Sequence, residues 1–444
     1  MKARRMSSLL VSLVLSLGLV ACSTSAPAPE KPAEKSGKQE EAAKTEPIKL
    51  MFWGGVPEDA GPKEVVETWN KANPDIQVEY VRYVNDDAGN LKLDTALLTG
   101  QQIDLFATYL LPRLEQRTKA GYTLNLSEFK DYDIDKMMGP AAADWKINDK
   151  YYALPTKFIK ELFFLNKDAL DKAGLPVPYE WTWEDVREYS TKLKAQNKWG
   201  LVQDTGTGYH VASLDGSLVA QGYTKADGTS NFDNPYIKTY LQMLHDMMHT
   251  DKTTPTLAEQ ISTKMPVEAT FLKGEAFMFN GGNYAFRFTN NLKDYPRNFK
   301  IALAPPPKGV NKDQKDFKVF SGLGDAISIN AKTAHKEAAW KFLKWYADGG
   351  MLPMAKGGRL PSSKAVNREQ VLKLLLGDAK DTYDVPSLEK TLYHEMPSYV
   401  PKLNQQIVDM RREEYEKYLI NKQPLNQTID NMVKRHNEYL KNAK

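Results

Sequence analysis

Two histidines, His245 and His249, are spaced so that both would lie on one face of a helix. Zinc proteases use this spacing with a glutamate directly after the first histidine, which serves as the general base. Here that position holds Asp246, whose side chain is one methylene shorter, and no third ligand is evident. We therefore predict no functional metal and interpret both histidines as part of a solvated helix face.

Other catalytic patterns are equally weak. The sequence contains neither a Gly-x-Ser-x-Gly elbow nor a phosphate-binding loop. Acidic residues are numerous, but the distance between two carboxylates, which defines a glycosidase pair, cannot be read from a sequence. The single cysteine, Cys22, lies at a predicted cleavage site and is a poor candidate for a nucleophile. We predict neither an enzyme nor a bound cofactor.

Aromatic and acidic residues beside predicted strands are the stronger signal. Trp53 comes just after the apolar residues of the first predicted strand, and Tyr109 follows the third, where parallel sheets place ligand loops. Asp86 and Asp87 follow the second strand and could bind hydroxyl groups or cap the next helix. Aromatic rings cover the apolar faces of a sugar, and carboxylates, amides and arginines satisfy its hydroxyls. These residue types favour a carbohydrate ligand.

The composition is that of an ordinary globular chain. Its 444 residues are 41% hydrophobic and 26% charged, enough for two or three domains. Lys2, Arg4 and Arg5 lie in the first 21 residues, which contain no acid, so without them the formal charge falls from +4 to +1. A nearly neutral chain gives no electrostatic reason to expect nucleic acid as a partner.

The amino terminus has the pattern of a lipoprotein leader. The basic residues precede an apolar run, residues 9–20, which is too short to span a membrane but suits a signal peptide. The run ends Leu-Val-Ala-Cys, which resembles a bacterial lipobox, in which the cysteine is lipidated and becomes the mature amino terminus. We expect a signal peptide at 1–21, lipidation at Cys22 and a disordered tether at 22–46. The protein would then lie on the extracellular face of the cytoplasmic membrane.

The elements that would position the aromatic and acidic residues alternate in type. Strands are predicted at 48–53, 76–84 and 103–107, with helices at 62–73 and 91–98 between them. Repeated strand–helix–strand order implies parallel strands covered by helices. The sequence therefore predicts an α/β fold.

The stretch 148–192 is the most informative part of the chain. Pro155 is expected to end or edge a strand, because proline cannot donate to a ladder. Residues 162–165, Leu-Phe-Phe-Leu, suit a buried strand. Thr182 and Asp185 have the spacing of a capping box at the start of a helix.

Five motifs, in this order, resemble those of bacterial extracellular solute-binding proteins of the ABC-importer family that includes the maltose-binding protein. They lie at residues 96–108, 148–192, 271–284, 304–309 and 357–361. Leu165 replaces the family's usual tyrosine, and Ile103 replaces its usual proline. The resemblance covers nearly all of residues 47–444.

This resemblance implies two lobes, each a mainly parallel sheet with flanking helices, joined by three chain crossings near residues 157, 321 and 360. The lobe boundaries that it implies are 47–157 with 322–359 for the first lobe, and 158–321 with 360–444 for the second. A ligand bound between the lobes would favour the closed form by hinge motion. The closed form of a protein that we expect to be a monomer would then dock on membrane permease subunits.

The crossings add further candidate ligand contacts. Phe158 lies at the first crossing, Asp325 and Arg359 lie near the later ones, and Tyr284 matches the family's cleft tryptophan. For each of them, core packing or surface charge is the alternative. The complete set of expected contacts is Trp53, Asp86, Asp87, Tyr109, Phe158, Tyr284, Asp325, Arg359 and, in a polar loop, Tyr209 and Asp215.

Two other ligand classes and one other protein class stay open. A glycerol-phosphate ester would require several arginines or lysines in the cleft, and a polyamine would require several acids. A surface glycoside hydrolase would convert the sugar instead of delivering it. An oligosaccharide is the ligand that we expect.

Overall fold

The computed structural model describes residues 46–442, apart from residues 204, 206–208, 393, 395 and 401 and the side chain of Tyr209. The expected signal peptide, Cys22 and the tether to residue 45 lie outside the described residues. Within the described part of the chain, no helix combines the length and the apolar character that a membrane span requires.

The first three long strands are parallel, as predicted. They are β1 (Ile48–Gly54), β2 (Ile76–Arg82) and β3 (Leu105–Thr108), with β1 in the middle. Helices α1 (Pro62–Ala72), α2 (Asp87–Thr99) and α3 (Leu111–Lys119) connect or follow them. Since all three strands run in one direction, their carboxyl ends meet at one edge of the sheet.

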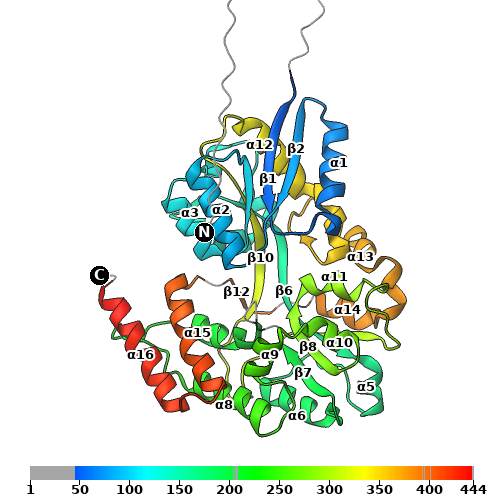
Figure 1. Cartoon of the computed structure of the whole chain (residues 1–444), viewed down its shortest axis with the longest axis vertical. Helices are drawn as coiled ribbons and strands as arrows, with labels where there is room; N and C mark the ends of the chain where they lie inside the picture. The colour runs from blue at the N-terminus through cyan, green and yellow to red at the C-terminus, as the bar shows by residue number, and fades with distance from the viewer. Residues whose placement is uncertain are drawn as a thin grey trace, which may run out of the picture. The chain divides into compact units, whose positions relative to one another are not determined.

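Two long strands, β6 (Leu154–Asn166) and β10 (Val319–Ile329), run side by side from the first half of the sheet into the second (Figure 1). Strand β10 pairs antiparallel with β3 and with the first part of β6. On its other edge, β6 pairs with the short β11 (Leu360–Pro361). The three segments expected to be crossings therefore lie next to one another.

Pro155 does not end a strand, since it lies inside β6, opposite Ala326 of β10. The edge alternative holds locally, because β11 pairs with β6 only at Lys157 and Phe158. The carbonyl of Pro155 accepts a hydrogen bond from Ser362 Oγ at 2.7 Å, on the side of β6 that faces away from β10. The N–H that proline lacks is therefore not required by the β10 ladder.

The second half of the sheet adds three strands to the later part of β6. They are β7 (Trp199–Gln203), β8 (Ala276–Gly282) and β9 (Ile301–Ala304). Strands β8 and β9 pair antiparallel with β6, and β7 pairs parallel with β8. Helix α6 (Trp183–Leu193) begins with the predicted capping box, in which Thr182 and Asp185 satisfy each other's backbone N–H.

Separate hydrophobic cores stabilise the two halves. One contains Leu50, Phe52, Trp69 and Phe342 beneath β1 and α12 (Lys336–Trp345). The half-buried Phe158 packs against this core and also against a core of the other half.

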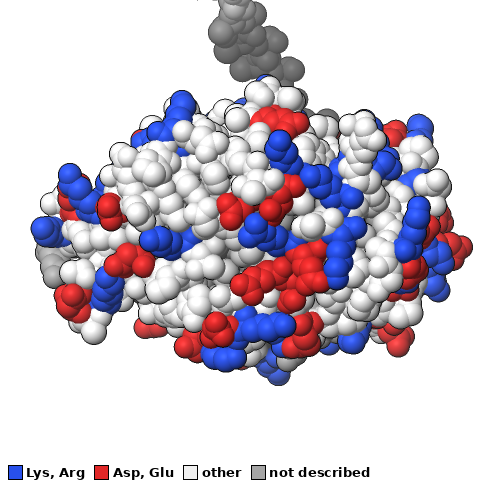
Figure 2. Space-filling model, turned by 90° about the horizontal axis from the view of Figure 1, so that it is seen from below, with Lys and Arg blue, Asp and Glu red and all other residues white. Residues whose placement is uncertain are grey.

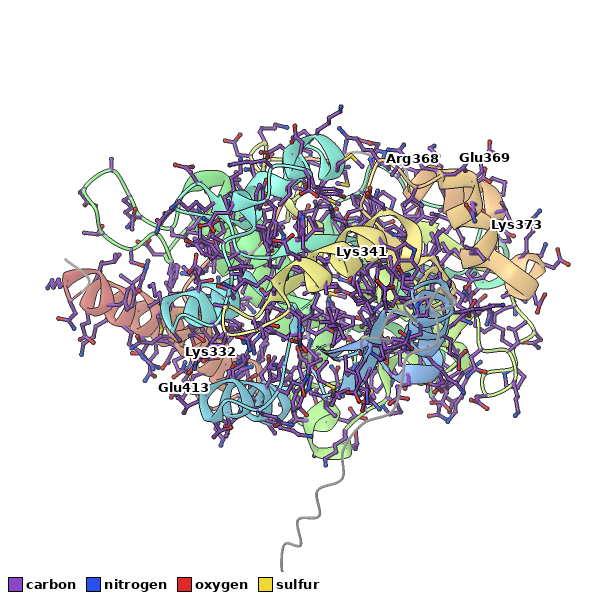
Figure 3. The ribbon with its side chains drawn as sticks, turned by 90° about the horizontal axis from the view of Figure 1, so that it is seen from above. Lys332, Lys341, Arg368, Glu369, Lys373 and Glu413 are labelled. Atoms are coloured by element: carbon purple, nitrogen blue, oxygen red, sulfur yellow. The ribbon has the colours of Figure 1, made fainter. Side chains whose placement is uncertain are left out.

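Figure 3 shows Lys341 on α12 and the charged residues Arg368, Glu369 and Lys373 on α13 (Arg368–Leu376).

Helices near the carboxyl terminus pack on α8 (Pro235–His249), which carries the histidine pair. Helices α15 (Gln405–Leu419) and α16 (Leu425–Asn442) both contact α8 (Figure 1). The His245 ring stacks on Tyr418, and His249 Nε2 lies 2.8 Å from the carbonyl oxygen of Leu419. The two histidines therefore contact another helix, and their expected place on a solvated face is wrong.

Candidate functional site

Tyrosines hold the loop that follows β1, at the carboxyl edge of the parallel strands. The hydroxyl of Tyr109 accepts a hydrogen bond from the backbone N–H of Gly55 at 2.6 Å. The hydroxyl of Tyr80 donates to the carbonyl of Val56 at 2.8 Å and accepts from its N–H at 3.0 Å. A Cβ on Gly55 would lie 2.9 Å from the Tyr109 ring, so this close approach requires glycine. Tyr109 therefore positions the loop.

Trp53 lies inside β1 and not after it, because the strand continues to Gly54. Only 2% of its surface is exposed, and its ring packs with Tyr83, Leu93 and Phe106. Its indole Nε1 has no hydrogen-bond partner among the described residues. Strand alternation accounts for the burial, since Phe52 contacts the core on the opposite face of the sheet.

Asp86 and Asp87 have different roles. Asp86 is the N-cap of α2, and its Oδ1 accepts a hydrogen bond from the N–H of Gly89 at 2.7 Å. Asp87 is the exposed first residue of that helix and lies 2.6 Å from Arg113. The capping alternative is therefore confirmed for Asp86.

The three crossings carry one buried group of charges, Lys157 on β6, Asp325 on β10 and Arg359 directly before β11, which we name the hinge cluster. Lys157 Nζ lies 3.6 Å from Asp325 Oδ1, and Arg359 Nε lies 3.3 Å from Asp325 Oδ2. Each residue is at most 9% exposed. Two cations and one carboxylate therefore link the three segments between the lobes.

Electrostatics and backbone geometry both set this cluster apart. Burial lowers the pKa of Lys157 to about 8, opposed by the charge of Asp325 and assisted by that of Arg359. Asp325 has a φ of 44°, the left-handed region that side chains other than glycine rarely adopt. Backbone strain of this kind persists where the surrounding structure enforces it.

The second lobe contributes a ring and a cation after β8. Tyr284 belongs to the 3-10 turn η5 (Asn283–Ala285), and Arg287 to the short helix α11 (Phe286–Thr289). The guanidinium of Arg287 lies 5.6 Å from the Tyr284 ring centroid. Burial and then the positive charge of Arg359 lower the pKa of Arg287, so the hinge cluster lies within electrostatic reach.

A cavity of about 800 Å³ lies between the two halves of the molecule. On one side it is lined by residues that follow or flank β1 and β2, including Pro57 and Arg82. On the other side it is lined by Arg287, Phe288 and Asn290 of the second half. Its volume lies within the range of small-molecule sites.

A second cavity, of about 500 Å³, lies beside the crossings. Phe158, Lys160, Ser321 and Leu360 line it. The buried Lys160 donates to the carbonyls of Leu392 and His394, at 3.0 and 2.5 Å. Among the described residues that line this cavity, Phe158 is the one predicted contact.

The chain matches one protein family over most of its length. Residues 53–348 match the bacterial extracellular solute-binding proteins. This protein belongs to that family. One relative is the multiple sugar-binding protein of Streptococcus mutans, which is 28% identical; the match covers 65% of this chain and 68% of the relative. Another is the arabinooligosaccharide-binding protein of Bacillus subtilis, which is 26% identical; the match covers 77% of this chain and 76% of the relative.

The fold of this solute-binding protein is that of solved two-lobed structures. An ABC substrate-binding protein of Listeria monocytogenes, solved in complex with cycloalternan, aligns with a TM-score of 0.73 at 22% identity, covering 89% of this chain and 99% of that one. The two-lobed α/β fold implied by the motifs is thereby confirmed.

Two predicted contacts lie away from the crossings. Asp215, on α7 (Ala212–Gln221), lies 2.6 Å from Arg411 of α15 in a buried ion pair. Tyr209 lies in the 3-10 turn η4 (Tyr209–Val211), and its side chain lies outside the described residues. No group of three metal-ligating side chains occurs in the described part of the chain.

Sequence reasoning missed Lys157 and Arg287. Lys157 lies in a stretch that is otherwise mostly apolar, from Leu154 to Asn166, and a buried strand holding a lysine is a signal that could have been used. Arg287 lies three residues after Tyr284, which ends the Gly-Gly-Asn-Tyr motif. Its closeness to Arg359 depends on tertiary structure, which the local pattern does not contain.

Proposed function

We propose that this solute-binding protein captures a carbohydrate, specifically an oligosaccharide, between its lobes and delivers it unchanged to the permease subunits of an ABC importer. The observation that carries the proposal is the cavity of about 800 Å³ between the two halves, which brings arginine, amide and aromatic side chains together. Amides and arginines bond to sugar hydroxyls, and rings cover sugar faces. The names of the two relatives support the same ligand class.

The proposed lobes are residues 47–157 with 322–359, and residues 158–321 with 360–444. Phe158 supports this division because it packs against the cores of both halves. A ligand that contacts both lobes makes all its contacts only when they meet, so it shifts the population towards the closed form. The hinge cluster would then hold the three crossings together while the lobes move.

The proposed ligand contacts are Phe158, Tyr284, Asp325 and Arg359. None of them is among the described residues that line the cavity of about 800 Å³, so they would reach the ligand from beside it. Tyr284 and Phe158 are half-buried, so each keeps part of its ring surface exposed. Tyr109 and Trp53 would support the site indirectly. Tyr109 holds the loop after β1, and Trp53 packs in the core beside the sheet.

A thermal-shift screen of the purified protein against neutral and acidic oligosaccharides tests the proposal. A ligand at about 100 times its Kd raises the free energy of unfolding by roughly 2.7 kcal/mol. Mass spectrometry of the sugar after long incubation should recover it intact. A screen without any shift would contradict the proposed ligand class, and cleaved sugar would favour a glycoside hydrolase.

We further propose that Cys22 carries a lipid that anchors the protein to the extracellular face of the membrane. The only cysteine of the chain closes a signal-peptide pattern. Cys22→Ser should release the protein from the membrane fraction or leave it unprocessed. If the variant is cleaved and fractionates like the wild type, the anchor is wrong.

A further inference from the structure

Arg287 is a half-buried cation to which the described residues offer no hydrogen-bond acceptor. Its guanidinium lies 4.5 Å from the Phe288 ring centroid and 5.6 Å from that of Tyr284. Its Nε is buried without a partner, and no described residue accepts a hydrogen bond from it or forms an ion pair with it. Two rings therefore hold the guanidinium in place while its donors stay available to another molecule.

Arg297 of the same lobe shows what a structural arginine looks like here. It also packs on a ring, with its guanidinium 5.6 Å from Tyr383. Its two terminal nitrogens, however, donate to the Thr289 carbonyl at 2.7 Å and to Thr382 Oγ1 at 2.5 Å. The Nε of each arginine is buried without a partner, so the difference lies in the terminal nitrogens, which donate to described residues in Arg297 but not in Arg287.

Positive charge gathers around Arg287. Besides burial, the charges of Arg359 and Arg82 lower its pKa, and the charge of Glu268 opposes them. Arg359 belongs to the hinge cluster, which has two cations for one carboxylate. Arg287 thus lies within electrostatic reach of Arg359, Arg82 and Lys157, and Glu268 is the acid whose charge opposes them at Arg287.

Two of these cations line the cavity between the lobes. Arg82, exposed at the carboxyl end of β2, and Arg287 lie on opposite halves of its wall. The acids that also line it are Asp59, Glu64, Asp294 and Asp378. Glu64 is already bonded to Lys356 at 3.2 Å, and no acid of the described chain forms an ion pair with Arg82 or Arg287.

The cavity lining is mixed in sign, with three cations, Arg82, Arg287 and Lys356, and four acids among the described residues. Figure 2 shows lysines and arginines interspersed with acids over the face seen from below. Selection by charge would therefore depend on Arg82 and Arg287, the two lining cations that form no ion pair with a described acid.

We propose that the captured saccharide is acidic and that Arg287, assisted by Arg82 and Arg359, binds its carboxylate or phosphate group. The inference rests on the proposed function and names the ligand class of the same site. A guanidinium binds either anion with two parallel N–H···O bonds, which a neutral hydroxyl cannot match. The chemistry is shared by uronate oligosaccharides and by sugar or glycerol phosphates.

Calorimetric titration of the full chain with matched ligands tests this proposal. Tri-galacturonate and neutral galactotriose form the first arm, and glycerol 3-phosphate and glucose 6-phosphate form the second. We expect the acidic ligand of one arm to bind at least about tenfold more tightly than neutral galactotriose, by an amount that falls as salt is added. The arm that binds identifies the source of the anion.

Arg287→Gln should then weaken binding of the acidic ligand by about tenfold to hundredfold and change neutral saccharide binding little. Lys341→Gln on α12 is the control, because it removes an exposed cation that is not among the described residues lining the cavity. It should leave the acidic preference in place. Circular dichroism confirms that both variants fold.

The outcomes separate the two proposals. Neutral saccharides that bind as tightly as acidic ones, or equal loss for both kinds in Arg287→Gln, would overturn the acidic ligand while the carbohydrate function stands. Binding of glycerol 3-phosphate alone would keep the anion site and overturn the carbohydrate. A chain that binds no member of the panel contradicts both.

Discussion

Two of the groups of charged side chains inside the molecule differ in composition and in the elements that hold them. The hinge cluster joins Lys157, Asp325 and Arg359 from three segments that run between the lobes. The second group is the pair Asp215–Arg411, which joins two helices of the second lobe at 2.6 Å. The pair within one lobe is neutral, whereas the cluster at the crossings has one cation in excess. Burial alone therefore does not mark a ligand contact.

The largest expected effect is the loss of the shared carboxylate in the hinge cluster. Asp325→Asn leaves two buried cations without a counter-ion, which should lower the free energy of unfolding by about 3–5 kcal/mol. Asparagine tolerates the left-handed backbone at this position, so the charge is the main change. Urea denaturation measures the effect. A loss below about 1 kcal/mol would show that the cluster is well hydrated.

Loss of one partner of the Asp215–Arg411 pair should lower the free energy of unfolding slightly less, and two apolar side chains should be able to replace the pair. Arg411→Met leaves Asp215, whose side chain is 18% exposed, partly able to bind water, so we expect a loss of about 3 kcal/mol. The double variant Asp215→Leu, Arg411→Met removes both charges and should recover most of that loss. A double variant no more stable than the single one would indicate that the pair also does something besides stabilising the lobe.

The two groups also show what the sequence could and could not predict. The parallel order of the first strands, the capping box at Thr182 and the two-lobed fold were predicted, because local pattern and motif order specify them. The buried places of Trp53 and Pro155 were not, because they depend on how long β1 and β6 become once neighbouring strands pair with them.

Charge partners were the least predictable feature. Asp215, Asp325 and Arg359 were chosen from the sequence, but no local pattern indicated their partners. Asp215 pairs with Arg411, and Asp325 pairs with both Lys157 and Arg359. Ion pairs between distant segments leave no periodic signal. The candidate site was therefore predicted as a set of residues and not as an arrangement of charges.

A third buried charge extends the comparison, because Glu161 on β6 has an amide partner and no cation partner in the described chain. Asn280 Nδ2 donates to its Oε1 at 3.2 Å, and burial raises its pKa from 4.5 to about 8. The folded state thus holds a proton that the unfolded state releases, so stability should fall as pH rises from about 4.5 to about 8.

Glu161→Gln should remove that slope. Glutamine keeps the amide hydrogen bond without a charge, so the variant should be more stable than the wild type by roughly 1–3 kcal/mol at about pH 9 and nearly equal to it at about pH 4. Urea denaturation across this pH range measures the difference. Equal pH slopes in the two proteins would show that Glu161 is ionised in the folded state.

The smallest expected effect has the opposite sign and comes from Lys157, on the same strand. Its pKa is lowered from 10.5 to about 8, so between these values the unfolded chain holds more protons than the folded one. The free energy of unfolding should therefore rise with pH in this window, by roughly 1–2 kcal/mol, and should not respond to Lys157 below about pH 8. Lys157→Gln should flatten the rise, and Lys356→Gln, on an exposed lysine already paired with Glu64, should keep it.

An acidic ligand near the hinge cluster would stabilise the protonated lysine, so binding at about pH 9 should take up a proton in the wild type and not in Lys157→Gln. Calorimetry in two buffers of different ionisation enthalpy measures that uptake, and its absence in the wild type would place the anion beyond the reach of Lys157.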